Sequence, residues 1–74
     1  MIEYEEWLIR LGDVLKMIRK KKKLTQTQTA DLAEINYSFY RSVEYGKRPV
    51  SSRTLWKICE ALDTSMRDVV SMAG

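Results

Sequence analysis

Apolar residues recur at helical spacing from the start of the 74-residue chain. Trp7, Leu8, Leu11, Leu15 and Ile18 follow one another mostly at intervals of three and four, which places them on one stripe of a helix. This pattern predicts a helix over about residues 3–22. Its glutamates lie in the first turn and its lysines in the last, where each charge favours the helix dipole.

Two short helices are expected in the middle of the chain. Thr25 is a suitable N-cap for a helix that ends at about residue 33. Asn36 can cap the next helix, over about residues 37–45, and Gly46 stands in the usual place just after a helix end. Because so few residues separate these two helices, they must cross steeply, as in a helix-turn-helix.

The last third of the chain predicts two more helices. Ser51 or Ser52 can cap a helix over about residues 53–62, and Ser65, three residues before Asp68, can open a short fifth one. No alternation typical of strands interrupts this series. The sequence therefore predicts an all-α fold, a compact five-helix domain that occupies residues 1–74.

Composition excludes several classes of protein. With 45% hydrophobic and 31% charged residues the chain is globular, and no apolar run is long enough to span a membrane. The opening segment is acidic and has no signal-peptide core, so we expect a cytoplasmic protein. A single cysteine, Cys59, and the absence of histidine argue against a zinc site, any other metal or cofactor, and an enzyme. Cys59 is expected in the core.

The charge pattern allows a polyanionic partner. The net charge is only +3, but residues 19–23 are all basic, and Arg41, Lys47, Arg48 and Arg53 follow in the middle of the chain. A positive region of this kind suits nucleic acid. A basic run is also common at the solvated end of a helix, and this alternative stays open for residues 20–23.

From about residue 11 to residue 70, the chain resembles the lambda-repressor-like, Cro-type helix-turn-helix proteins, also called the xenobiotic-response-element family. The matching residues are Leu24-Thr25-Gln26, Ala30, Ile35-Asn36, Val43-Glu44-Tyr45-Gly46-Lys47-Arg48-Pro49 and Ala61-Leu62-Asp63. The small size and the stretch Tyr37-Ser38-Phe39 also look like the controller proteins of restriction-modification systems. The resemblance implies a lambda-repressor-like DNA-binding domain.

Four residues depart from the family pattern. Lys23 and Glu34 stand where glycine is usual, so we expect both in the left-handed conformation with some strain. Thr29 replaces a common leucine and should weaken the packing of its helix. Tyr40 replaces a small aliphatic residue, so the core must enlarge around it or leave its hydroxyl at the edge.

The resemblance also implies which residues face DNA. It places Gln26 near a phosphate and turns Tyr37, Ser38, Arg41 and Ser42 toward the major groove, where a helix fits and base pairs differ in donors and acceptors. Lys47 and Arg48, just past that helix, are expected at backbone phosphates. Other interpretations remain: Gln26 suits any helix start, and Arg41 can pair with a nearby carboxylate instead.

Two further contacts are expected. The family pairs an arginine late in the first helix with a glutamate before the glycine, and here these residues are Arg19 and Glu44. The last helix carries more apolar surface than so short a helix can hide, which suggests a dimer contact rather than a lid on the core. The residues expected in that contact are Met66, Val69 and Val70.

The hypothesis from sequence is a sequence-specific, DNA-binding transcriptional regulator, a repressor or an activator. It would bind double-stranded DNA at a pseudo-palindromic operator as a homodimer, because two recognition helices are needed for useful specificity. The alternative is a protein-interaction module on the same fold, such as an antitoxin or coactivator-like domain, because fold alone does not settle function.

Overall fold

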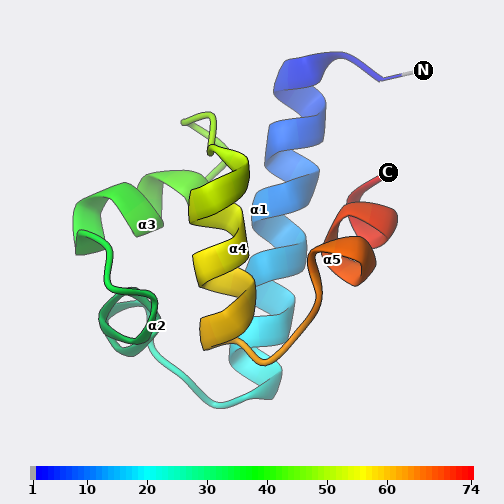
Figure 1. Ribbon diagram of the computed structural model, residues 1–74. Coiled ribbons are helices and arrows are strands. Elements are labelled where there is room, and N and C mark those ends of the chain that lie inside the picture. The colour runs from blue at the N-terminus through cyan, green and yellow to red at the C-terminus, as the bar shows by residue number, and fades with distance from the viewer. Residues whose placement is uncertain (1) are drawn as a thin grey trace.

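Five helices make up the fold in the computed structural model, which describes residues 2–74 (Figure 1). They are α1 (Tyr4–Lys21), α2 (Gln26–Ala33), α3 (Tyr37–Glu44), α4 (Ser52–Ala61) and α5 (Met66–Ala73). No strand occurs within residues 2–74. The predicted all-α architecture is confirmed, and each helix bound predicted for the first four helices differs from the observed one by at most one residue.

Side-chain caps begin four of the five helices. Thr25 and Gln28 form a reciprocal capping box at the start of α2, in which each side chain bonds the backbone N–H of the other residue. Asn36 accepts from the Phe39 N–H to begin α3, and Ser65 begins α5 in the same way. At α4 the cap is Ser51, since its hydroxyl accepts from the Thr54 N–H.

The turns between helices use left-handed residues. Lys23 (φ 59°) and Glu34 (φ 58°) adopt this conformation, as expected from the missing glycines. Asp63 (φ 53°) does so too, which the sequence did not predict. Gly46 (φ 72°) ends α3 against the backbone of Ile9, where a side chain has no room.

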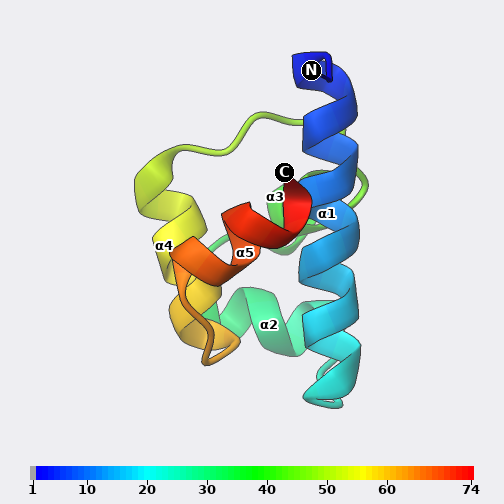
Figure 2. The same cartoon turned by 90° about the vertical axis from the view of Figure 1, so that its right-hand side faces the viewer.

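The core lies between α1 and the other helices. Helix α1 packs against α3 and α5, and α4 packs against α2 and α5. Figure 1 looks along α2 while α3 lies across the view, so these two helices cross steeply as predicted. Figure 2, turned by 90°, shows α5 lying across the gap between α1 and α4. The largest fully buried side chains are Tyr40, Leu11, Leu15, Ile58, Leu62, Val43, Val69, Thr29 and Cys59.

Gly12 brings α1 and α3 into close contact. A Cβ atom at this position would collide with the carbonyl oxygen of Glu44 and would lie 2.9 Å from that of Val43. The glycine is therefore a contact point and not a break in the helix, since α1 continues through it. This contact fixes the position of α3 along the axis of α1.

Burial decides between the two alternatives for Tyr40 and corrects the expectation for Val69. Tyr40 is fully buried, so of the two alternatives for this residue the core encloses it and its hydroxyl is not at the edge. Val69 is also fully buried and packs in the core of its own chain, so it is not available to a dimer partner. Among the described residues, no helix is both long and apolar enough to cross a membrane.

Candidate nucleic-acid interface

The inner face of α3 carries a buried carboxylate, that of Glu44. Arg19 of α1 donates two hydrogen bonds to it, from Nε to Oε2 at 2.9 Å and from Nη2 to Oε1 at 2.8 Å. Glu44 is only 3% exposed, and Arg19 is buried as well. This bidentate geometry is the strongest form of an arginine–carboxylate contact. The predicted ion pair is present.

Two more side chains complete this group, which we call the Glu44 cluster: Arg19, Gln26, Tyr40 and Glu44. The Tyr40 hydroxyl donates to Glu44 Oε2 at 2.6 Å, and Gln26 Nε2 donates to Oε1 at 3.2 Å. The carboxylate therefore accepts from residues of α1, α2 and α3. The cluster joins both helices of the helix-turn-helix to α1.

The hydrogen bonds keep Glu44 ionised. Burial alone would raise the pKa of its carboxyl group, but the bonds from Arg19, Tyr40 and Gln26 lower it more, so the pKa lies below its usual value. Burial, and then the same carboxylate, raises the pKa of Tyr40, so its hydroxyl stays protonated as a donor. The charge on Glu44 is stable at neutral pH and is matched by Arg19.

The outer face of α3 carries the residues predicted to read DNA. Tyr37, Ser38 and Arg41 are exposed, and Ser42 is half-buried. The Ser42 hydroxyl donates to the Ser38 carbonyl oxygen at 2.9 Å, which leaves its lone pairs free to accept. The structure thus brings these four residues together on one surface, which we call the recognition face.

Arg41 contacts an aromatic residue that the sequence analysis missed as a site residue, Tyr45. Its Nε donates to the Tyr45 hydroxyl at 3.4 Å, and its guanidinium carbon lies 5.3 Å from the centre of the ring. The hydrogen bond with Tyr45 raises the pKa of Arg41 and lowers that of Tyr45. No carboxylate pairs with Arg41 within residues 2–74. The spacing of four residues was the available signal for this contact.

A shallow groove of about 300 Å³ lies on the recognition face. Its lining is Ser38, Arg41, Ser42, Tyr45 and Lys47. The predicted phosphate residue Lys47 therefore borders the predicted base-reading residues. Its neighbour Arg48 is exposed, and its guanidinium carbon lies 5.9 Å from the centre of the Phe39 ring. Lys47 therefore extends the face past the end of α3.

Gln26 bonds the Glu44 cluster through one N–H group of its side-chain amide. It lies at the first position of α2 and is half-buried, with its amide nitrogen turned to Glu44. In the free protein Gln26 therefore forms a direct hydrogen bond with Glu44, on the recognition helix. The bond to Glu44 uses one of the two N–H groups of that nitrogen, so the other is left to donate to a phosphate.

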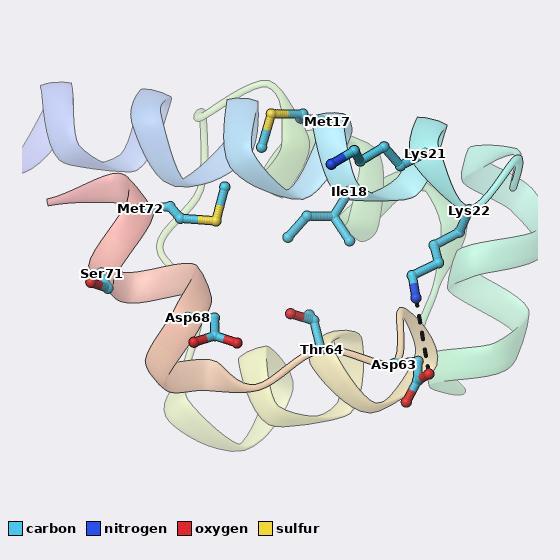
Figure 3. Close-up of a pocket in the computed structure, with 9 residues that line it drawn as sticks. All are labelled: Met17, Ile18, Lys21, Lys22, Asp63, Thr64, Asp68, Ser71 and Met72. Carbon is cyan, nitrogen blue, oxygen red and sulfur yellow. Dashed lines mark ion pairs between the residues drawn. The ribbon is translucent and has the colours of Figure 1, made fainter.

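The remaining candidate residues lie elsewhere. Met66 and Val70 belong to α5, which packs against α1 and α4. A second pocket, of about 390 Å³, lies between the end of α1 and α5, with Met17 and Met72 at one end and the Lys22–Asp63 ion pair (3.9 Å) at the other (Figure 3). Cys59 is buried as expected, and burial raises the pKa of its thiol to about 11, which makes it unreactive.

Comparisons with known proteins agree with this geometry. The sequence profile of the helix-turn-helix family matches residues 15–69, which include the whole Glu44 cluster and the recognition face. The chain belongs to the helix-turn-helix family. This is a family of DNA-binding regulators, as the sequence predicted.

Relatives include restriction-modification controllers. Control protein C.MunI of Mycoplasma sp is 38% identical over 64 residues, which is 85% of this chain and 86% of the relative. The restriction-modification controller protein C.AhdI of Aeromonas hydrophila has a similar structure, with a TM-score of 0.82 and 34% identity over 84% of this chain and 94% of that one. The clp gene regulator ClgR of C. glutamicum has a TM-score of 0.87 and 30% identity over 90% and 86%. The resemblance to controller proteins is confirmed.

Proposed function

We propose that this protein is a transcriptional regulator of the restriction-modification controller type that binds a pseudo-palindromic operator as a homodimer. The observation that carries the proposal is the division of α3 into two faces. The inner face is fixed by the Glu44 cluster, while the outer face presents polar and cationic side chains to solvent. A rigid helix with such an outer face fits the major groove.

The outer residues have distinct roles in this proposal. Arg41 binds guanine through O6 and N7, which is the commonest specific contact in the major groove. Ser38 and Ser42 are short and discriminate weakly, and Tyr37 contacts a thymine methyl group or a phosphate. Phosphate contacts come from three residues, which fix the register without reading sequence: Gln26, Lys47 and Arg48.

Dimerisation is assigned to α5. Val70 and Met72 are exposed apolar residues on this helix, and Met66 is half-buried beside them. A two-fold dimer places its recognition helices about 34 Å apart, so that they enter successive turns of the major groove. Sedimentation velocity should show a dimer for the native chain and a shift toward monomer for Val70→Asp. We also propose that the protein is cytoplasmic and binds DNA without catalysing a reaction.

Salt-dependent DNA binding tests the proposal. Fluorescence anisotropy with a labelled duplex of random sequence is measured across a series of salt concentrations. We expect an affinity that falls steeply with salt, since each phosphate contact contributes about 0.9 to the slope of log K against log salt. Lys47→Ala should reduce that slope by about 1.

A matched control is Lys16→Ala. This residue is also an exposed lysine, but it lies on α1, outside the recognition face and outside the helix assigned to the dimer. Its loss should leave the slope unchanged. Equal effects of the two substitutions would show that only net charge matters and would contradict the proposed interface. No binding at low salt would favour the alternative, a protein-interaction module on the same fold.

A further inference from the structure

Three side chains with polar ends are spaced four residues apart on and just after α3: Tyr37, Arg41 and Tyr45. Residues four apart lie on the same side of a helix, one turn above the other. All three are exposed, so the arginine lies between two aromatic residues on the surface that faces solvent. None of these three side chains takes part in the hydrogen bonds of the Glu44 cluster.

Tyr45 holds Arg41 by two kinds of contact. The guanidinium lies over the ring, at 5.3 Å from its centre, and Nε donates to the ring's hydroxyl at 3.4 Å. With Nε turned to Tyr45, the two terminal nitrogens, Nη1 and Nη2, remain without a partner among residues 2–74. These are the two nitrogens that can donate together to the O6 and N7 atoms of guanine.

An arginine that is already oriented loses less side-chain freedom when it binds. Arg41 is otherwise a long, flexible and exposed side chain. Contact with a rigid ring reduces the number of conformations that DNA binding must remove, which is the general advantage of preorganisation. Tyr45 is the residue at the C-cap of α3, so its backbone is fixed by the end of the helix.

We propose that Tyr45 is a positioning residue that orients Arg41 toward guanine, so that the preference for guanine at one base pair depends on Tyr45. The inference rests on the proposed function, because it needs α3 in the major groove. It adds a determinant of specificity that acts through Arg41 and need not touch a base.

Selection of binding sites tests the inference. The native chain and the variants Tyr45→Ala, Tyr45→Phe and Arg41→Ala each select duplexes from a random pool. Affinities are then measured for the enriched site and for the same site with each guanine replaced in turn by 7-deazaguanine, which lacks the N7 acceptor. Arg41→Ala identifies the guanine that Arg41 reads, because replacement of that guanine no longer matters in this variant.

The expected result is a smaller preference at that one guanine. Tyr45→Ala should lower the ratio of affinities for guanine and 7-deazaguanine there by about two- to fivefold, the effect of losing one exposed cation–π contact. Tyr45→Phe keeps the ring and should lose less. In the Arg41→Ala background, Tyr45→Ala should have no further effect, because its role acts through Arg41.

Three results would overturn the inference. The first is an unchanged guanine preference in Tyr45→Ala. The second is an equal loss of affinity for every duplex, in Tyr45→Phe as well, which would make Tyr45 a phosphate contact. The third is a loss that persists without Arg41. Failure of the native chain to enrich any site would instead remove the proposed function. Thermal unfolding should be unchanged in the Tyr45 variants, since this side chain is 47% exposed.

Discussion

Both faces of α3 contain a tyrosine paired with a charged residue four positions away, and the two pairs differ in every other respect. On the inner face the Tyr40 hydroxyl lies 2.6 Å from the Glu44 carboxylate, in the core. On the outer face Arg41 lies 3.4 Å from the Tyr45 hydroxyl, in solvent. The same spacing thus gives a contact that fixes the helix where water is excluded and a contact that orients a side chain for binding where it is not.

Burial explains the difference in role. A charge in the core must keep its partners, because an unpaired buried charge is strongly destabilising. The inner pair therefore sets the position of the helix and cannot respond to a ligand. A surface contact contributes little to stability. The outer pair can therefore replace its contacts with water by contacts with DNA.

The largest effect is expected from Arg19→Met. This change leaves the Glu44 carboxylate buried without its counter-charge and should lower the free energy of unfolding by about 3–5 kcal/mol. Urea denaturation followed by circular dichroism measures it. Arg10→Met is the matched control, since Arg10 lies on the same helix but pairs with Glu6 only at 3.9 Å on the surface. Its effect should stay below about 1 kcal/mol. Equal effects would contradict the distinction between buried and exposed charge.

Tyr40→Phe should have the next largest effect. It removes one hydrogen bond to a charged acceptor and adds no volume, so the expected loss is about 1.5–3 kcal/mol in the same experiment. Tyr37→Phe makes the identical chemical change on the outer face and should alter stability by less than about 0.5 kcal/mol. A Tyr40→Phe variant as stable as Tyr37→Phe would show that the carboxylate does not need this donor.

Acid should destabilise the protein through Glu44. The pKa of this carboxyl is lowered in the folded protein from its ordinary value of 4.5. Its contribution is therefore complete above pH 4.5 and is lost as the pH falls below 4.5 through the folded value, at about 1.4 kcal/mol for each pKa unit of difference. Urea midpoints between pH 7 and pH 3 should fall less steeply for Glu44→Gln than for the native chain. Glu60→Gln, an exposed residue of α4, should retain the native slope.

The sequence predicted the framework of the fold because helix signals are local. Thr25, Asn36 and Ser65 bond backbone groups three residues away, so each can be recognised from its own segment. The Arg19–Glu44 pair came from the family resemblance and not from periodicity. The outward direction of Arg41 was also implied by that resemblance, and the structure agrees with it.

Contacts between segments were harder to predict. Periodicity predicts which face of a helix is apolar, but it does not say what a buried polar atom meets. The sequence left two alternatives for Tyr40, an enlarged core or a hydroxyl at the edge. Glu44 lies one turn away on the same inner face and gives the hydroxyl an acceptor in the core. Val69 was assigned to a dimer surface because α5 has several apolar residues, and only the packing shows which of them point inward.

The smallest effect on stability, and the most informative one, is expected from Arg41→Ala. This exposed side chain has no carboxylate partner among residues 2–74, so its loss should change the free energy of unfolding by less than about 0.5 kcal/mol. The same substitution should weaken binding to a selected site by about 1–3 kcal/mol, the discrimination of one bidentate contact. Anisotropy with the selected duplex and urea denaturation of the same sample measure both quantities. A variant that lost stability as Arg19→Met does would place Arg41 in the framework, whereas a loss confined to DNA binding means that α3 keeps structure and recognition on separate faces.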